Sequence, residues 1–416
     1  MSFYEDSSII ITPNAYKAGT LYAVAPTSGL ADMDFTRATA ATRVDENGLV
    51  ADVLSGVPRI DYTGGGCPHI LAEPQRTNLI TYSEAFDNAY WTKNNSSVVI
   101  GQSSPSGDTS AFKLVESVGV AAHFIQMGTI SYTPTNDYTL SVFAKSTERY
   151  MQLLFDNSPF PDGTFANFDL ITGVVGTSNG CTSTITIMDD GWYKCTITAT
   201  SDATTTATGG YFMLQDNSSA VFSDTYTGDG VSGVYIWGAS LELGSYATSY
   251  IPTAGATVTR NQDVFTKDGI SSLINSEEGV LFAEIAALSN DGTSRDISVS
   301  DGSSSNYARI SLSNAVGKIE YNVVVGGSTK ASGVSAITQT NFNKIAVKWK
   351  VNDFALWVNG SEVLTDLSGT SFTASTLTTL NFDRGSGTNY FYGKVKQLQV
   401  YPTALSDSEL TILTTP

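Results

Sequence analysis

The fold class is decided by the stretch Lys344-Ile345-Ala346-Val347-Lys348-Trp349-Lys350-Val351-Asn352-Asp353-Phe354-Ala355-Leu356-Trp357-Val358-Asn359-Gly360. Over residues 344–351, one face would carry Ile345, Val347, Trp349 and Val351, and the lysines would lie on the other. The alternation resumes after Asn352-Asp353 and ends at Asn359-Gly360, a dipeptide typical of tight hairpin turns. A period of two residues is the signature of a half-buried strand. The stretch therefore predicts a β-hairpin with one buried face.

The same alternation occurs elsewhere in the chain. Residues 138–145 show it, and residues 234–243 would carry on one face Tyr235, Trp237, Ala239, Leu241 and Leu243. Asp-Gly and Asn-Gly turn signals separate many of these stretches. Only one helix start is persuasive, the capping box Ser406-Asp407-Ser408-Glu409, which we expect to cap the last sandwich. The predicted fold class is all-β.

The 416 residues divide into four segments. Residues 1–75 are predicted to be an irregular segment that anchors or docks the protein, with packing against the first sandwich as the alternative. Residues 76–252 form one strand-rich unit, residues 253–262 a polar linker, and residues 263–416 a second strand-rich unit. Each unit has enough strands for a two-sheet sandwich or jelly roll. The prediction is therefore two tandem β-sandwich domains behind an irregular N-terminal segment.

The composition excludes several classes of partner. Only 15% of residues are charged, and 40 acidic against 22 basic residues give a formal net charge of −18. Nucleic-acid binding requires a basic surface, so no nucleic-acid partner is expected. The charge also disfavours anionic lipid, and no run of 18 apolar residues exists, so we expect no membrane insertion. The acidity is interpreted as a source of solubility, with cation binding as the alternative.

Three cysteines are present, Cys67, Cys181 and Cys195. Their odd number and wide spacing fit neither a disulfide framework nor a zinc site. They are interpreted as buried reduced thiols, and a single Cys181–Cys195 bridge stays open as an alternative.

The N-terminal sequence Met1-Ser2-Phe3-Tyr4-Glu5-Asp6 is acidic and lacks the basic start of a secretion signal, so no signal peptide is expected. The surface composition nevertheless resembles that of extracellular β-proteins. A viral structural protein reconciles the two observations, because it is made in the host cytoplasm and leaves by lysis. The expected location is the virion surface.

Three groups of motifs carry a family resemblance. The first comprises Asp34-Phe35-Thr36-Arg37-Ala38-Thr39, Pro58-Arg59-Ile60-Asp61-Tyr62 and Glu73-Pro74-Gln75-Arg76-Thr77-Asn78-Leu79. The second comprises Tyr82-Ser83-Glu84-Ala85-Phe86, Asp190-Gly191-Trp192-Tyr193-Lys194, Ile236-Trp237-Gly238-Ala239 and Tyr250-Ile251-Pro252. Together these two groups resemble a module of phage tail and head-fibre proteins that is similar to jelly-roll carbohydrate-binding modules. The third comprises Leu356-Trp357-Val358-Asn359-Gly360 and Ala404-Leu405-Ser406-Asp407, and resembles a concanavalin A-like, laminin-G-type sandwich.

The resemblance implies a bacteriophage virion surface protein: a tail fibre, a head fibre, a spike or a capsid decoration protein. It also implies assembly as a homotrimer, contact with other virion proteins and receptor binding to host cell-surface glycans. A concanavalin A-like sandwich by itself hosts lectins, hydrolases and pure spacers, so the fold alone does not decide among them.

The sequence does not predict an enzyme. Glycoside hydrolysis needs two carboxyl groups about 5–10 Å apart across the scissile bond. Glu277 and Glu278 are adjacent and would point to opposite faces of a strand, and Glu284 stands alone. The only histidines, His69 and His123, are interpreted as structural, and no G-x-S-x-G nucleophile motif occurs. No catalytic residue is therefore assigned.

Calcium is the metal that acidic loops could hold, because it prefers several oxygen ligands. The candidate ligands are Asp189, Asp190, Asp224 and Asp229. Their spacing matches no calcium-binding loop motif, and Asp-Gly turns account for them without a metal. No cofactor is required, and a structural calcium ion is the only one considered.

Glycan binding is the main functional hypothesis. Sugars dock on exposed aromatic rings while polar groups bond their hydroxyls. The tryptophans Trp192, Trp237 and Trp349 lie on alternating stretches and are interpreted as core. Loop aromatics are the candidates for carbohydrate binding: Tyr150, Phe160, Phe165, Tyr390 and Tyr392. A purely structural capsid or tail component without a ligand is the alternative, and a polysaccharide depolymerase is the third class.

Overall fold

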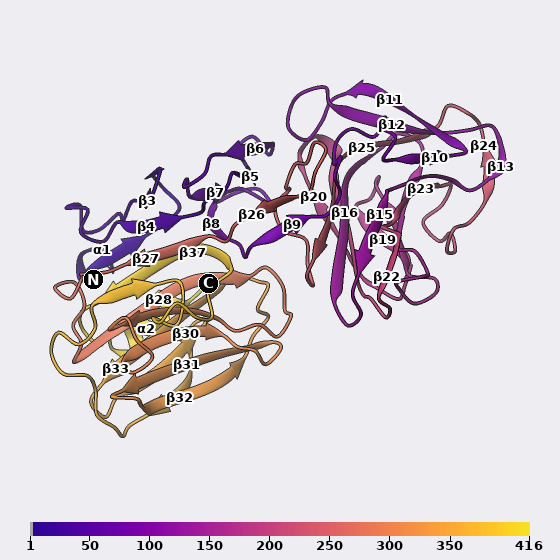
Figure 1. Cartoon of the computed structure of the whole chain (residues 1–416). Coiled ribbons are helices and arrows are strands. Elements are labelled where there is room, and N and C mark those ends of the chain that lie inside the picture. Colours follow the sequence, from indigo (N-terminus) through magenta and orange to yellow (C-terminus); the bar gives the residue numbers. More distant parts are fainter. Residues whose placement is uncertain (1–2) are drawn as a thin grey trace.

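The structure is a computed structural model that describes residues 3–416, so Met1 and Ser2 of the acidic N-terminus lie outside the described residues. Two β-sandwiches lie side by side, with the N-terminal strands along the upper edge of the second one (Figure 1). The predicted all-β class is confirmed, because only two short α-helices, α1 (Phe3–Asp6) and α2 (Asp407–Thr414), occur in the described chain. No helix of residues 3–416 is long and apolar enough to cross a membrane.

Two six-stranded sheets form the first sandwich. One sheet has the order β10 (Thr92–Asn94), β14 (His123–Gln126), β23 (Tyr211–Gln215), β17 (Tyr150–Leu154), β18 (Phe165–Asp169), β19 (Val174–Asn179). The other has the order β11 (Ser96–Gln102), β12 (Ala111–Glu116), β25 (Gly233–Leu243), β16 (Asp137–Ser146), β21 (Tyr193–Thr200), β20 (Thr182–Ile187). Short ladders join β13 (Gly119–Ala121) to β24 (Tyr226–Gly228) and β15 (Thr129–Tyr132) to β22 (Thr205–Thr208).

The alternation in β16 behaves as the sequence predicts, because its core residues are Tyr138, Leu140, Val142 and Ala144. The prediction that residues 235, 237, 239, 241 and 243 of β25 share one face is wrong. Gly238 lies at φ +60°, and the register between β16 and β25 shifts beside it. An extra residue in one strand reverses the side-chain alternation. Ala239 therefore points into the core, whereas Trp237 points outward and packs on Tyr250 with ring centres 4.7 Å apart.

The second sandwich has two larger sheets. The first has the order β35 (Ser361–Asp366), β34 (Phe354–Val358), β33 (Asn343–Lys350), β28 (Glu278–Ala287), β37 (Gly393–Tyr401), β8 (His69–Ala72), β7 (Arg59–Asp61), with β1 (Ile9–Ile11) also paired to β37. The second has the order β2 (Tyr16–Lys17), β3 (Thr20–Leu21), β4 (Met33–Thr36), β27 (Val264–Lys267), β36 (Thr379–Asn381), β29 (Arg295–Ser300), β30 (Tyr307–Leu312), β31 (Lys318–Val325), β32 (Ser328–Ala336).

The N-terminal segment differs from the sequence prediction, because it adds strands to both sheets of the second sandwich. Ile9 pairs with Val400, and Phe35 pairs with Phe265. Most of the buried apolar side chains of this segment, Ile9 and Phe35 among them, share one core with Trp349. The alternative expectation, packing against the first sandwich, also holds for part of the segment, because Val50 shares a buried cluster with Phe143 and Trp237 of that sandwich. A hairpin of β5 (Ala41–Val44) and β6 (Val50–Val53) completes it.

The stretch predicted to be a linker is also partly ordered into a strand. β26 (Val258–Arg260) pairs antiparallel with β9 (Arg76–Asn78). These two strands lie between the sandwiches in Figure 1. The crossing between the two units is thus a paired ribbon.

The hairpin that decided the fold class is formed by β33 and β34, and its inner face lies in the core as predicted. Its other face is not left to solvent, because α2 packs on it. Trp357 and Leu410 belong to one cluster there, and Lys348 is only 4% exposed. Glu409 accepts a hydrogen bond of 2.6 Å from the Ser406 backbone, which confirms the predicted capping box. Val351, expected on the inner face, lies in the turn and is exposed.

Five charged side chains are buried together where the N-terminal segment meets residues 260–263: Arg37, Arg59, Glu73, Arg260 and Asp263. Arg37 Nη1 lies 2.9 Å from Asp263 Oδ1, and Arg59 bridges Asp263 and Glu73. Arg260 Nη1 lies 2.9 Å from Glu73 Oε2. We call this group the buried ion cluster.

The electrostatics of the buried ion cluster keep it charged. Burial alone would raise the pKa of Glu73, but Arg260 and Arg59 outweigh burial and hold that pKa well below its usual range. Burial likewise opposes the charge of Arg59, yet Asp263 and Glu73 raise its pKa. Removal of one partner from such a network leaves a buried charge without compensation, which is strongly destabilising.

The substitution Asp263→Ala strands Arg37 and Arg59, and we expect it to lower the free energy of unfolding by about 3–5 kcal/mol. Urea unfolding followed by tryptophan fluorescence measures this loss. Lys145→Ala is the matched control, since it breaks the exposed pair with Asp190 and should cost less than about 1 kcal/mol. Equal stability of the two variants would contradict a structural role for the buried ion cluster.

Candidate functional site

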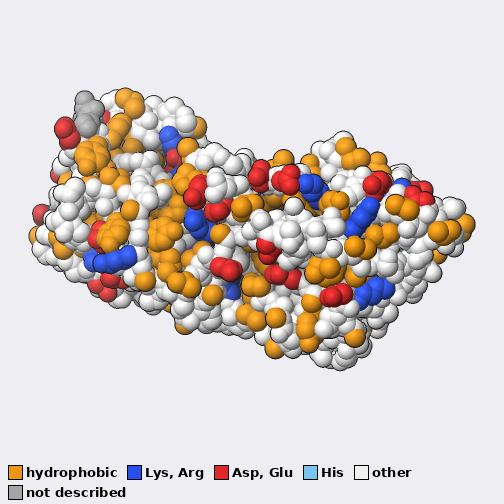
Figure 2. All heavy atoms as spheres, turned by 90° about the horizontal axis from the view of Figure 1, so that it is seen from above, with side chains coloured by type: hydrophobic (Ala, Val, Ile, Leu, Met, Phe, Trp, Pro, Cys, Tyr) orange, Lys and Arg blue, Asp and Glu red, His pale blue; other side chains and the backbone are white. Residues whose placement is uncertain are grey.

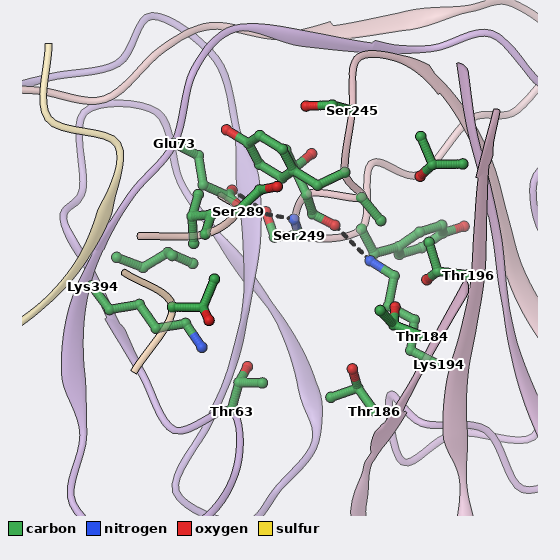
Figure 3. Close-up of a pocket in the computed structure, with 18 of the residues that line it drawn as sticks. Thr63, Glu73, Thr184, Thr186, Lys194, Thr196, Ser245, Ser249, Ser289 and Lys394 are labelled. Atoms are coloured by element: carbon green, nitrogen blue, oxygen red, sulfur yellow. Dashed lines mark hydrogen bonds between the residues drawn. The ribbon is translucent and has the colours of Figure 1, made fainter. Parts of the chain in front are cut away.

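A cleft of about 770 Å³ lies between the two sandwiches (Figure 3). Strands β20 and β21 of the first sandwich form one wall. The other side is formed by residues 42–44, Asp61 and Thr63 of the N-terminal segment and by residues 288–291 of the second sandwich. Residues 245–250, which follow β25, also line the cleft. The site therefore draws on both sandwiches and on the segment that joins them.

The first wall is a surface of threonine hydroxyls. Side chains two residues apart share a face of a strand, so β20 presents Thr182, Thr184 and Thr186, and β21 presents Thr196, Thr198 and Thr200. Threonine is favoured in strands because its Cβ is branched, so a row of threonines is compatible with a stable sheet. The register pairs Thr184 with Thr196. Within residues 3–416 no hydrogen bond engages the hydroxyls of Thr184, Thr186 or Thr196, which leaves them free for a ligand.

Lys194 projects from the same wall, opposite Thr186 in the register. Its Nζ donates a hydrogen bond of 2.5 Å to the Thr248 carbonyl and lies 5.7 Å from the centre of the Phe143 ring. Burial lowers the pKa of Lys194, and Glu242 opposes that effect only in part. A cation thus lies next to the row of hydroxyls.

The opposite wall carries Asp61, Glu73 and Lys394. Asp61 accepts backbone hydrogen bonds of 2.8 Å from Val44 and Thr63. Glu73, already paired in the buried ion cluster, also accepts a bond of 2.7 Å from the Ser249 hydroxyl. Figure 3 shows Lys394 across the cleft from Lys194. Both carboxylates therefore have partners, whereas the ammonium group of Lys394 has no hydrogen bond or ion pair within residues 3–416.

The two histidines are structural, as the sequence predicts. His69 is 2% exposed and its Nε2 lies 3.3 Å from Asp61 Oδ1. Burial lowers the pKa of His69 to about 4, although Asp61 opposes that shift. His123 is fully buried and its Nδ1 lies 2.7 Å from the Asn95 carbonyl. Neither is placed as a catalytic base.

Two of the predicted carbohydrate contacts are wrong. Phe160 is 1% exposed and stacks on Phe155, with ring centres 4.1 Å apart. Phe165 is 5% exposed and packs against Phe222. The neighbouring Pro and Asp-Gly residues do form turns, but both rings fold inward because burial of an aromatic ring is strongly stabilising. Neither ring has a free face for a sugar.

The other three predicted contacts keep some exposure but do not line the cleft. Tyr150 begins β17 beside Gln215 of β23. Tyr390 and Tyr392 stack with ring centres 6.1 Å apart, and Tyr392 donates a hydrogen bond of 2.7 Å to Gln262. Their role in ligand binding stays a prediction. The predicted burial of Trp192, Trp237 and Trp349 is confirmed, since all are at most 3% exposed, although Trp192 and Trp237 pack in a cluster outside the core of the first sandwich.

The candidate calcium ligands serve turns and ion pairs. Asp190 lies 2.9 Å from Lys145 Nζ, and Asp229 accepts bonds from Ser232 and from the Val231 backbone. Asp224 accepts a hydrogen bond of 2.8 Å from the backbone NH of Thr225, and Asp189 lies with Asp190 in a single 3₁₀ turn. Among residues 3–416, no three His, Cys, Asp or Glu side chains gather as a metal site would require.

The cysteines differ in exposure. Cys195 is buried and Cys181 half-buried, and burial raises the pKa of Cys181 to about 11. Cys67 is exposed, so its predicted burial is wrong: the glycine-rich turn before it does not pack inward. All three are free thiols, and no Cys181–Cys195 bridge forms.

A second, smaller pocket of about 320 Å³ lies on the first sandwich. Its lining includes the half-buried rings of Phe124, Tyr211 and Phe222, with Asp156 and Asn157 alongside. Tyr211 donates a hydrogen bond of 3.1 Å to Asp156. The sequence signal for this pocket was weak, because the three rings come from separate stretches.

Comparisons with known proteins classify only part of the chain. Residues 281–411 match the family described as the concanavalin A-like lectin/glucanases superfamily, in agreement with the fold predicted for the second unit. No curated protein matches the chain.

Several solved structures are partly similar. The CBM40 of Ruminococcus gnavus IT-sialidase is 20% identical, with 35% of this chain and 86% of that chain covered and a TM-score of 0.30. The leech intramolecular trans-sialidase is 21% identical, with 33% and 23% covered and a TM-score of 0.29. The receptor-binding domain of botulinum neurotoxin mosaic serotype C/D is 14% identical, with 36% and 39% covered and a TM-score of 0.29. At these scores the similarities support no conclusion about function.

His69 makes the free energy of unfolding depend on pH. Its folded pKa of about 4 lies below the unfolded value of about 6.5, so between these values the unfolded chain binds more protons. Stability is therefore lost as pH falls from 6.5 towards 4, by about 2 kcal/mol between pH 7 and pH 5. We expect His69→Gln to abolish this part of the pH dependence in urea unfolding, whatever it does to stability at pH 7. An unchanged slope would show that His69 is not the group responsible.

Proposed function

We propose that the chain is a surface protein of a bacteriophage particle that binds a host oligosaccharide in the cleft between its two sandwiches. The observation that carries this proposal is the threonine wall on β20 and β21, in which the hydroxyls of Thr184, Thr186 and Thr196 have no partner within residues 3–416. A sugar offers donors and acceptors at short, regular intervals, and the paired threonines offer both at strand spacing.

The remainder of the cleft suits the same ligand. Pockets that bind small molecules combine apolar surface with a few fixed polar groups, and volumes of roughly 300–1,000 Å³ are usual. Val50, Phe143 and Met188 give the cleft apolar surface beside the hydroxyls. The CH faces of a sugar ring pack on such side chains while its hydroxyls bond the threonines.

The assignment to a phage particle rests on the motifs around Arg37, Arg59 and Glu73, which resemble those of phage fibre modules. On the face seen in Figure 2, acidic and basic side chains are interspersed and no continuous basic surface occurs. That surface offers no support for a nucleic-acid partner. We propose that the protein assembles as a homotrimer and contacts other virion proteins. Sedimentation equilibrium of the purified chain gives the number of copies.

The double substitution Thr184→Val and Thr196→Val removes two facing hydroxyls and keeps both strand-forming side chains. We expect oligosaccharide binding to weaken about tenfold, since each hydrogen bond contributes about 0.5–1.5 kcal/mol. A glycan array identifies the ligand of the unmodified chain, and calorimetric titration compares the variants. Thr227→Val is the control, because Thr227 is exposed on β24 and lies outside the cleft.

Two outcomes would replace the proposal. If the purified chain binds no glycan, the role of a structural particle component without a ligand is favoured. If reducing sugar is released from host polysaccharide, the protein is a depolymerase.

A further inference from the structure

Two lysines in the cleft lack a charge partner. Within residues 3–416, neither Lys194 nor Lys394 lies within 4.0 Å of a carboxylate. They stand on β21 and β37, in different sandwiches. Figure 3 shows them on opposite sides of the cleft, with the Lys394 amine directed into the space between them.

The position of Lys194 is costly without a ligand. An ammonium group has three donors, and within residues 3–416 the contacts of the Lys194 ammonium group are the Thr248 carbonyl and the face of Phe143. The side chain lies deep in the cleft and is only partly exposed. The carboxylate of Glu242 offsets the desolvation of this charge only in part, and an anion beside the ammonium group would reduce the remaining penalty.

The acidic side chains of the cleft do not supply the missing charge. Glu73 is held by Arg59 and Arg260, and Asp291 by Arg295. Asp61 accepts two backbone NH groups. The fourth acid, Asp137, accepts the Thr200 hydroxyl at 2.6 Å. The third cation, Arg43, donates to the Ile60 carbonyl and lies 3.9 Å from Glu46. Among the three cations that line the cleft within residues 3–416, only the two lysines have no carboxylate within 4.0 Å.

We infer that the cleft selects an anionic oligosaccharide, whose acidic group lies between Lys194 and Lys394 while its hydroxyls bond the threonine wall. This inference rests on the proposed function and names the class of its ligand. A sugar carboxylate and a sugar sulfate share the required chemistry. The net charge of −18 repels densely charged polyanions at long range, which favours short chains with isolated acidic groups as ligands.

The test compares matched probes on the full chain by calorimetric titration. Lactose is the neutral probe, 3′-sialyllactose and tri-galacturonate carry carboxylates, and lactose 3′-sulfate carries a sulfate. We expect at least one acidic probe to bind ten times or more tightly than the neutral probe. Its affinity should fall as sodium chloride rises, because salt screens the charge pair, whereas neutral binding should not change.

The variants Lys194→Met and Lys394→Gln locate the effect. Each should weaken the binding of acidic probes about tenfold, and should weaken acidic probes more than it weakens the neutral sugar. Lys350→Gln is the control, since Lys350 is 49% exposed, pairs with Glu278 and lies outside the cleft. Lys394→Gln keeps the test decisive if Lys194→Met fails to fold.

The failures of the two proposals are distinguishable. Equal binding of neutral and acidic probes, with no effect of either lysine variant, overturns the anionic selection and leaves oligosaccharide binding in place. Absence of binding by every probe and by a broad glycan array overturns both. The ratio of carboxylated to sulfated probe affinity tells which acidic group the cleft accepts.

Discussion

The buried ion cluster is the interaction on which the rest of the structure depends. Arg37, Arg59 and Glu73 come from the N-terminal segment, and Arg260 and Asp263 come from the stretch that follows the first sandwich. Ser249, near the end of the first unit, also bonds Glu73. Because an ion pair in an apolar interior tolerates little misalignment, the cluster fixes how the three parts meet. The cleft exists because that meeting leaves β20 facing the N-terminal segment.

The sequence predicts local structure well where the residues that form an element and those that contact it lie close together in the chain. The alternation around Trp349 gives a correct hairpin, and Ser406 and Glu409 give a correct helix start. It predicts poorly where partners lie far apart. Nothing local in Ile9 shows that it pairs with Val400, so the N-terminal segment looks irregular until the second sandwich is folded. The motifs around Arg37, Arg59 and Glu73 stood out in the sequence, but their ion pairs could not be read from it.

The candidate site shows the same limit. Phe160 and Phe165 lie near turn signals, which made them plausible contacts, yet each ring gains more by entering the core. Thr184 and Thr196 look like ordinary strand formers. Their alignment into one wall follows from a register between two strands and from the position of the second sandwich. A polar residue repeated at every second position of an edge strand is the one signal that could have indicated the wall.

The buried ion cluster also affects the free energy with which a ligand would bind in the cleft. A ligand that touches β21 and Lys394 must contact two sandwiches at once, and an ordering cost arises if they move independently. If the buried ion cluster holds the two sandwiches rigidly before binding, the ordering cost has already been met during folding. More of the free energy of each ligand contact then contributes to affinity. The coupling is mutual. A ligand that binds only when the two sandwiches are held together stabilises that arrangement by RT ln(1 + [L]/Kd). In the proposed complex, the buried ion cluster would act on binding through Glu73, which belongs both to that cluster and to the lining of the cleft opposite the threonine wall.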